Sequence, residues 1–386
     1  MVNFVFLSVY FYSVPNLRFA GYIDNYRTCK LIDISEIVTR TNENNSEYPI
    51  MMISAGKGFI AQSEKYSRDN AGTSINKYIL LKKGELAYNR GNSKQFPYGA
   101  IYEMKEECAL IPYVYHCFNI YDESTRYFSH YLNSPFKDEQ LSKIITSSVR
   151  GNGLLNISKN DFFNLSLNVP SIKEQNKIAK FLDLIDQRIQ TQSKIINDYK
   201  ILKNHIIKSF IKQNGTSYLL SEIAELGRGR VINSAEISKQ KNPIYPVYSS
   251  QTSNNGIMGY LDNYDYEGEY ITWTTDGANA GTVYYRNGKF NCTNVCGILK
   301  IKNGYDAYYI SNILNCYTKK YVSTNLANPK LMNNVMANIK INLPSIEQQK
   351  HSSKILQSIE YRVEIEEDIK LNLVKQKAFL LKNMFI

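Results

Sequence analysis

The sequence lacks the motifs on which nucleotide-driven and group-transfer chemistry depends. It contains no G-x-x-x-x-G-K-[ST] loop, so ATP-driven movement is not expected of this chain. No glycine-rich loop follows a strand and opens a helix, because the GRGR stretch at 227–230 is too short and follows a helix end. The NPIY stretch at 242–245 lacks the second proline of the Asn-Pro-Pro-Tyr motif of adenine methyltransferases. These absences predict a chain that binds and does not catalyse.

Metal ligands are also scarce. The chain has four histidines, and its six cysteines form no C-x-x-C pair. Cys292 and Cys296 have no second pair of ligands nearby, which disfavours a zinc site. Buried, reduced thiols of a cytoplasmic protein are the expected state of Cys29, Cys108, Cys117, Cys292, Cys296 and Cys316. No metal site is predicted.

Membrane-spanning apolar runs are missing as well. The apolar opening, MVNFVFLSVYFYSVP, is too short to cross a bilayer and has no basic leader. A buried strand and extra sequence from an upstream start codon are two explanations that stay open. We predict no targeting segment, no contact with a membrane and a cytoplasmic location.

The chain does have a large apolar content and an excess of basic residues. Hydrophobic residues make up 43% of its 386 positions, which is enough for more than one folded core. The 46 lysines and arginines against 35 acidic residues give a formal net charge of +11. A basic balance of this size favours nucleic acid as a partner.

Part of the sequence occurs twice. Residues 170–182 read PSIKEQNKIAKFL and residues 344–356 read PSIEQQKHSSKIL, and the offset of 174 positions holds to the end of the chain. Each copy follows an alternating stretch, LSLNVP or IKINLP, which predicts a strand that ends at a proline. Each then continues for about forty residues without proline or glycine. The repeat predicts that a strand followed by a long helix is built twice.

Both copies have apolar residues at the spacing of a coiled-coil seam. The predicted seam positions are Ile178, Leu182, Ile185, Ile189 and Ile196 in the first helix, and Leu356, Ile359, Val363, Ile369 and Leu373 in the second. Ser171 and Ser345 are suited to cap the two helices, with Glu174 or Gln348 at the third helical position.

A helix of forty residues is about 60 Å long, and one apolar stripe cannot stabilise it alone. We therefore expect the two helices to pack antiparallel within one molecule, as an intramolecular coiled coil. Gln192 and Glu366 occupy equivalent positions and are expected to form a polar layer in it. Separate helical hairpins and coils between molecules are the alternatives.

The segments before the helices resemble each other more loosely. LIDISEIVTR parallels YLLSEIAEL, and GELAYNRGN parallels GEYITWTTDGANAG. Their alternation and their Gly- and Asn-rich turns predict β-rich domains, with late helices near 125–134 and 307–322. The predicted fold class is α+β, with two β-rich domains and two long helices related by a pseudo-twofold axis. The predicted boundaries are 1–165 and 214–337 for the domains, and 166–213 and 338–386 for the helices.

Together these stretches resemble the specificity subunit of type I restriction–modification enzymes. The stretches that carry the resemblance are PNLRFAGY at 15–22, KLIDISEI at 30–37, GELAYNRGN, TTDGANAGTVYYRNGKF at 274–290 and the two proline-led helices. It covers the chain from about residue 15 to the end. The sequence departs from the family pattern at Tyr26, where tryptophan is usual, and at Ser352 and Ser353, where apolar or small residues are usual.

The resemblance implies that each β-rich domain is a target-recognition domain that reads one half of a bipartite, asymmetric DNA site. It also implies that the helices scaffold DNA methyltransferase (modification) subunits and restriction/translocase subunits. S-adenosylmethionine, ATP and Mg²⁺ would serve those subunits, which supply the endodeoxyribonuclease and adenine-N6 methyltransferase activities, and this chain would hold no cofactor. A stand-alone or decoy DNA-binding protein, not coupled to restriction, is the alternative.

Residues that read DNA are expected among polar side chains on loops that rigid sheets hold. The candidates in the first domain are Asn89, Arg90, Asn92, Ser93, Lys94, Gln95, Arg150, Asn152, Asn156 and Lys159. Those in the second are Ser250, Gln251, Thr274, Thr275, Asp276, Asn279, Asn325, Asn328 and Lys330. An ordinary solvated turn is the competing interpretation for each of them.

Overall fold

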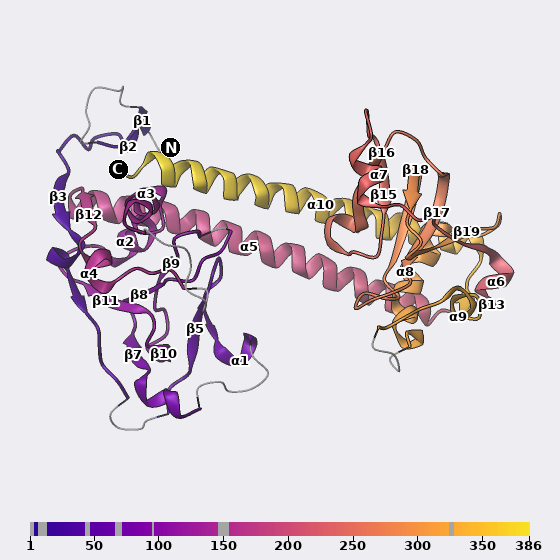
Figure 1. Ribbon diagram of the computed structural model, residues 1–386, viewed down its shortest axis with the longest axis horizontal. Helices are drawn as coiled ribbons and strands as arrows, with labels where there is room; N and C mark the ends of the chain where they lie inside the picture. The colour runs from indigo at the N-terminus through magenta and orange to yellow at the C-terminus, as the bar shows by residue number, and fades with distance from the viewer. Residues whose placement is uncertain are drawn as a thin grey trace. The chain divides into compact units, whose positions relative to one another are not determined.

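The chain forms two compact units in a computed structural model. The structure describes residues 4–6, 14–42, 47–65, 72–94, 96–145, 154–323 and 328–386. Unit 1 consists of Met1–Gln192 with Ile369–Ile386, and unit 2 of Ser193–Asp368. Each unit contains a β-rich head and one half of each of two long helices, α5 (Ile172–Ile211) and α10 (Ile346–Asn383) (Figure 1). The predicted α+β class, with two β-rich domains and two long helices, is confirmed.

The head of unit 1 is built from short strands. Its strands are β1 (Phe4–Phe6), β2 (Leu17–Phe19), β3 (Arg27–Lys30), β4 (Ser35–Ile37), β5 (Met51–Ser54), β6 (Gly58–Ala61), β7 (Ile79–Lys82), β8 (Leu86–Asn89), β9 (Ala100–Glu103), β10 (Cys108–Ile111), β11 (His116–Ile120) and β12 (Ser166–Val169). Its helices are α1 (Gln62–Lys65), α2 (Thr125–Tyr131), α3 (Pro135–Ile144) and α4 (Lys159–Phe163), with 3-10 turns at Leu31–Ile34 and Gly72–Lys77.

The head of unit 2 has longer strands. These are β13 (Thr216–Leu219), β14 (Ala224–Arg228), β15 (Tyr245–Tyr248), β16 (Ile257–Leu261), β17 (Tyr266–Thr274), β18 (Val283–Cys292), β19 (Cys296–Ile301) and β20 (Lys340–Leu343). The helices are α6 (Leu220–Ile223), α7 (Ser234–Ser238), α8 (Ala307–Tyr317) and α9 (Asn333–Ala337), with 3-10 turns at Ser253–Gly256 and Thr318–Tyr321.

The two heads share a sheet of four antiparallel strands. Its order is β4-β11-β8-β9 in unit 1 and β14-β19-β17-β18 in unit 2. In unit 2 the hairpin β15-β16 extends this sheet, because β15 pairs parallel with β18. In unit 1 the pairs β5-β6 and β7-β10 form sheets of their own. The heads thus share a core sheet and differ in what is inserted into it, which agrees with the looser sequence similarity before the helices.

A helix is fastened to the shared sheet in the same way in both heads. The side chain of Asn133, just after α2, accepts from Ile101 N at 3.0 Å and donates to Ile101 O at 2.5 Å. Asn315 in α8 makes the same two bonds to Val283, at 3.0 and 2.9 Å. A single amide thereby satisfies both backbone groups of an edge residue in β9 or β18. These helices correspond to the late helices that the sequence predicts.

Each head begins and ends at one place on a long helix. β3 pairs antiparallel with β12, and β13 pairs antiparallel with β20, so in each head a strand near the start lies beside the last strand. β12 and β20 then lead through a proline into α5 and α10. The core of unit 1 includes Ile178 and Leu182 of α5, and that of unit 2 includes Ile207 of α5 and Leu356 of α10. The head and the helix segments of each unit are therefore one packed body.

The two long helices run antiparallel within each unit. In unit 1, Lys377 of α10 binds Asp186 of α5 at 2.6 Å. In unit 2, Lys200 binds Glu367 at 2.7 Å and Lys203 binds Glu360 at 2.6 Å. The partner's number falls as the number in α5 rises, which is the signature of antiparallel packing. The predicted intramolecular pairing is confirmed.

Most predicted seam positions are buried or half-buried. Ile178, Leu182, Ile196, Leu356, Val363 and Leu373 are buried, and Ile185, Ile189 and Ile359 are half-buried. Ile369 departs from the prediction because it is 40% exposed. The buried positions around it, Glu366 and Leu373, are seven residues apart, and the half-buried Lys370 lies between them. The apolar spacing around Ile369 therefore gave the wrong phase for one turn. Gln192 and Glu366, the expected polar layer, are both buried.

A buried ion pair fixes the first turn of α5. Arg18 donates from Nε and Nη2 to the two carboxylate oxygens of Glu174, at 2.8 and 2.7 Å, and both side chains are buried. Tyr26, at the usual tryptophan position, donates its hydroxyl to Glu174 Oε1 at 3.2 Å. Glu174 thus bonds to Arg18 and Tyr26 of the head. At the start of α10 the expected capping box forms: Ser345 N donates to Gln348 Oε1 at 3.2 Å, and Gln348 N donates to Ser345 Oγ at 3.4 Å.

One glutamine ties each long helix to the short helix of its head. Gln175 donates to Pro170 O at 2.9 Å and accepts from Ser124 N, at the start of α2, at 3.0 Å. Gln349 makes the second set of bonds: it donates to Pro344 O at 2.9 Å and accepts from Asp306 N, at the start of α8, at 3.1 Å. In the second set the buried Ser353 also donates to Asp306 Oδ1 at 2.8 Å. This bond gives one of the two unusual serines of α10 a structural role.

The Glu174→Gln variant is expected to lower the free energy of unfolding of unit 1 by about 3–5 kcal/mol, because Arg18 keeps a buried charge without its partner. Urea denaturation of the full chain measures this loss. The control is Glu139→Gln in the exposed pair with Lys143, for which a change below about 1 kcal/mol is expected. Equal losses for the two variants would contradict a stabilising role for the buried pair.

Carbodiimide treatment is expected to couple Lys377 to Asp186 and Lys200 to Glu367, because this reagent joins amines to carboxylates only in direct contact. Mass spectrometry of the digested product detects the coupled peptides. A mixture of isotope-labelled and unlabelled chains should give no mixed pairs if the helices pair within a molecule. Lys377→Arg keeps the ion pair but removes the reactive amine, so its cross-link alone should vanish.

Candidate nucleic-acid interface

Two of the predicted clusters of the second head lie side by side. The loop after β17 forms an isolated antiparallel bridge from Asp276 to Lys330. Gly277 N donates to Pro329 O at 3.0 Å, and Leu331 N donates to Thr275 O at 2.8 Å. Residues 274–279 and 328–330, far apart in sequence, therefore form one surface segment.

A third predicted cluster joins this surface. Asn279 Nδ2 donates to Thr252 Oγ1 at 3.3 Å, which links the loop after β17 to the loop between β15 and β16. The second loop, residues 249–256, is shaped by backbone of positive φ at Asn254, Asn255 and Gly256. Gln251 turns inward and donates to Ile257 O, whereas Ser253, Asn254 and Asn255 are exposed. These loops follow strands of one rigid sheet.

The first head brings its two predicted clusters together in the same way. Gly91, after β8, bridges to Leu154, which precedes α4. Leu155 N donates to Arg90 O at 3.0 Å. β8 of unit 1 corresponds to β17 of unit 2 in the shared sheet, so both heads place the same two loops against each other. The sequence offered the clusters separately and gave no indication that they meet.

Exposure divides the candidates into two groups. Asn92, Lys94, Asn156, Lys159, Asn279 and Asn328 are exposed, and Ser93, Ser250, Asp276 and Lys330 are partly exposed. Five other candidates, Asn89, Arg90, Gln251, Thr274 and Thr275, are buried or turned into the fold. Gln95, Arg150, Asn152 and Asn325 lie outside the described residues, and their role in DNA reading stays a prediction.

Several of the inward-facing candidates make internal hydrogen bonds that stabilise the loops. Thr274 and Thr275 are 1% and 0% exposed, and Thr275 donates to Val295 O at 3.0 Å, so neither hydroxyl is placed to read a base. Arg90 donates to Ile157 O and Val114 O at 3.1 and 3.3 Å, and Asn89 accepts from Gly91 N at 2.9 Å. The burial of the two threonines disfavours direct contact with DNA, and whether any of these side chains reaches DNA stays a prediction.

Two basic residues of this surface were missed at the sequence level. Lys319 donates to Ala280 O at 2.9 Å and Thr282 Oγ1 at 3.2 Å, at the base of the loop after β17. Arg286 of β18 lies under the loop 249–256 and donates to Asn255 O at 2.9 Å. The alternation of a strand offered a signal, because Tyr284 and Arg286 must share one face. Which face is covered by a loop is decided by the fold.

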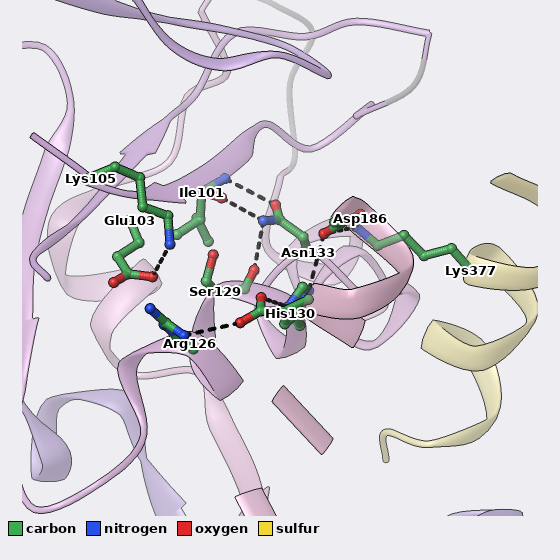
Figure 2. A network of polar contacts seen from close by, with 10 residues as sticks. Ile101, Glu103, Lys105, Arg126, Ser129, His130, Asn133, Asp186 and Lys377 are labelled. Atoms are coloured by element: carbon green, nitrogen blue, oxygen red, sulfur yellow. Dashed lines mark hydrogen bonds and ion pairs between the residues drawn. The ribbon is translucent and has the colours of Figure 1, made fainter. Parts of the chain in front are cut away.

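A polar network fastens the first head to both long helices (Figure 2). His130 of α2 contacts Asp183 of α5 at 3.0 Å, and Arg126 lies 3.5 Å from the same carboxylate. Asp186 of α5 binds Lys377 of α10 at 2.6 Å. The network borders a cleft of about 750 Å³ between the head and the helix segments of unit 1. These contacts hold the first head against the helix segments of its own unit.

The cleft has the wrong charge pattern for nucleic acid. Its basic lining residues are Lys57, Lys105, Arg126 and Lys377, and its acidic ones are Glu103, Glu106, Asp138, Asp183 and Asp186. Lys105, Arg126 and Lys377 are each paired with one of these carboxylates, so the cleft has no excess positive charge to attract phosphates. The better candidate interface is therefore formed by the loops that bridge each other at the end of the shared sheet, residues 90–94 with 154–159 in unit 1 and 274–279 with 328–330 in unit 2. We call them the paired loops. Among the residues that the structure describes, no three His, Cys, Asp or Glu side chains are grouped to hold a metal ion.

The family described as type I restriction modification DNA specificity domain matches residues 24–199 and 215–376. The chain belongs to this family. The two matched segments run from β3 into α5 and from β13 into α10, so each contains one head and most of one long helix. The family domain therefore occurs twice, and each copy is one recognition domain with its helix.

Similar proteins include specificity subunits of Mycoplasma pneumoniae (strain ATCC 29342 / M129 / Subtype 1). "Putative type I specificity subunit S.MpnORF201P" is 37% identical over 201 residues, which cover 51% of this chain and 83% of that protein. The type I restriction enzyme MpnII specificity subunit is 42% identical over 146 residues, 37% of this chain and 43% of that protein.

Solved structures share the fold over nearly the whole length. The S subunit of a type I restriction–modification system from M. genitalium has a TM-score of 0.61 at 14% identity, covering 97% of this chain and 99% of that one. A chain from a study of complex assembly and conformational transition in the type I restriction–modification system has a TM-score of 0.57 at 14% identity, covering 95% and 98%. No helix among the described residues is long and apolar enough to cross a membrane.

A buried histidine lies behind the paired loops of the first recognition domain. His116 is 4% exposed, and its Nε2 lies 3.4 Å from Ile157 O. Burial, with the nearby Arg90 guanidinium, lowers the pKa of His116 to about 4. An unfolded histidine titrates near its ordinary value of about 6.5, so the unfolded chain binds more protons between these values. The free energy of unfolding therefore falls as the pH drops from about 6.5 to about 4.

In wild type, protonation of His116 on unfolding should lower the free energy of unfolding by about 3 kcal/mol between pH 6.5 and 4. The His116→Phe variant should lack this decrease. Urea denaturation of both proteins at several pH values in that range measures the difference. His205→Gln is the matched control, because it removes an exposed histidine of α5 in place of the buried one. Parallel pH curves for wild type and His116→Phe would show that His116 titrates normally in the folded chain.

Proposed function

We propose that this chain is the DNA-specificity subunit of a type I restriction–modification complex, and that each recognition domain reads one half of a bipartite, asymmetric DNA site. The paired loops are the observation that carries the proposal. Both heads place Asn and Lys side chains that are exposed or partly exposed on two segments that bridge each other at the end of the shared sheet. Amide and basic groups on a rigid support are what contacts to base edges and phosphates require.

The two heads should read different sequences. They share a four-stranded sheet, but unit 2 adds β15-β16 and its loop 249–256 to that sheet, and unit 1 does not. The loops that would face DNA therefore differ in length, shape and charge. Different loops on a common support favour an asymmetric target.

The long helices would carry the partner subunits. Apolar side chains remain uncovered on both helices, among them Leu184 and Leu202 of α5 and Tyr361 and Phe379 of α10. Each unit has one such side chain from each helix, Leu184 and Phe379 in unit 1 and Leu202 and Tyr361 in unit 2. Exposed Lys173, Lys180, Lys350 and Lys354 lie near the starts of the two helices. Uncovered apolar side chains and exposed lysines on the helix segments of each unit suit contacts with protein subunits.

The partners would be DNA methyltransferase and restriction/translocase subunits, and the chemistry would be theirs. S-adenosylmethionine, ATP and Mg²⁺ are expected in those subunits, whereas this chain would select the site at which adenine-N6 methylation and cleavage occur. A stand-alone DNA-binding protein is the alternative. Co-expression with the methyltransferase subunit separates them, because a specificity subunit should co-purify with it and direct methylation to one sequence.

Exchange of residues 1–165 for the same region of a relative should change one half of the methylated sequence and leave the other half unchanged, because each head has its own sheet and loops. Sequencing of methylated adenines in co-expressing cells reads the result. Exchange of residues 214–337 is the reciprocal control and should change only the other half. Changes in both halves after a single exchange would refute independent reading by the heads.

A further inference from the structure

Arg286 carries a buried positive charge for which the described residues provide no carboxylate. It is 4% exposed on β18, and the groups that influence its titration are tyrosines and cysteines. Burial lowers the pKa of the guanidinium, which nonetheless stays charged because an arginine titrates far above neutral pH. By contrast, Arg18, the other buried arginine described above, is neutralised by Glu174. A buried cation without a counter-charge is unfavourable in the free protein.

The Arg286 side chain is held in one orientation. Its guanidinium carbon lies 3.5 Å from the ring centre of Tyr248 and 4.4 Å from that of Tyr284. Nε donates to Thr272 Oγ1 at 3.2 Å, on the neighbouring strand β17. Two aromatic faces and a hydroxyl therefore fix the plane of the guanidinium before any ligand arrives.

One edge of the guanidinium is left for a ligand. Nη2 donates to Asn255 O at 2.9 Å, so this side is used by the loop 249–256. A Cβ atom at Gly256 would lie 3.1 Å from Nη2, and Gly256 has a φ of +82°, so the loop backbone rests closely on the arginine. Nη1 has no acceptor among the described residues and is not among the enclosed unpaired atoms. Nη1 is therefore not fully enclosed, and it is the guanidinium nitrogen that is left for a ligand.

We propose that Nη1 of Arg286 binds a phosphate oxygen of the DNA backbone, a contact that rests on the proposed function of this domain. A phosphate supplies the missing negative charge, and a charge-assisted bond to a fixed donor is strong. A base edge is the less suitable ligand, because an arginine that is 4% exposed cannot extend into the major groove. The fixed guanidinium is thus a backbone clamp.

This contact would place the loop 249–256 for base reading. The exposed Ser253, Asn254 and Asn255 lie directly above Arg286, because Asn255 O is bonded to it. Lys319 supports the neighbouring loop after β17, which touches Thr252 through Asn279, and brings a second positive charge to this surface. A phosphate at Arg286 would therefore fix the register of these amides against the groove.

The test is the Arg286→Met variant in the full chain, assembled with its methyltransferase subunit. The probe is a DNA duplex that carries the methylated sequence found by the head-exchange experiment, and binding is measured over a roughly sixfold range of salt, from about 50 to about 300 mM. Loss of one phosphate contact should weaken binding roughly tenfold at low salt and reduce the slope of log K against log salt by about 0.9. The preferred bases should not change.

Two controls separate a clamp from a structural role. Lys289→Gln removes a charge from the same strand, but Lys289 already lies 3.7 Å from Glu267, so the salt slope should be unchanged. Arg286→Lys should retain the wild-type slope because it retains the charge. The melting temperature of free Arg286→Met should equal or exceed that of wild type, since the variant removes an uncompensated buried charge.

If the slope of log K against log salt is unchanged in Arg286→Met, the inference is wrong. A lower melting temperature of the free variant would also contradict it, because Arg286 would then stabilise the folded chain itself. A changed base preference at one position with an unchanged slope would replace the phosphate by a base. These outcomes leave the proposed function standing. If the wild-type assembly binds no duplex DNA, the proposed function fails and the clamp fails with it.

Discussion

The antiparallel pairing of two long helices is the constraint on which this molecule depends. Each helix has a single apolar stripe, and forty residues with such a stripe are not stable in water alone. Ion pairs such as Lys377–Asp186 and Lys203–Glu360 set the register, and burial of Leu182 and Leu356 joins the helices to the heads. Because each unit uses half of both helices, neither head can lose its helix segments without exposing its own core.

The heads are mounted on these helices by bonds that occur twice. A glutamine in the first turn of each long helix reaches the start of a short helix, and an asparagine at or just after the end of that short helix holds β9 or β18 of the shared sheet. The sheet, the short helix and the long helix form a rigid body, from which only the loops at one end of the sheet can vary. This division explains how one support can present two different surfaces to DNA.

Buried charge is used in two opposite ways. Arg18 is paired with Glu174 and contributes to the joint between the head and α5. Arg286 packs against Tyr248 and Tyr284 without a carboxylate; its Nη2 is bonded to the loop 249–256, and its Nη1 has no acceptor among the described residues. The cost of desolvation is similar for both side chains, so the difference lies in the partner. Arg18, paired with a carboxylate, stabilises the chain itself, whereas Arg286, which has no carboxylate partner among the described residues, can form an ion pair with a bound phosphate.

The sequence by itself determined the repeat, the long helices, their antiparallel pairing and the family, because these depend on periodic patterns that repeat over many residues. It also located the loops that carry Asn92, Lys94 and Asn279. It could not show that Gly91 meets Leu154 or that Asp276 meets Lys330, because bridges between distant segments leave no local pattern. The burial of Thr274 and Thr275, the exposure of Ile369 and the position of Arg286 under a loop were decided by tertiary packing. A strand's alternation says which side chains share a face, and only the folded chain says what covers that face.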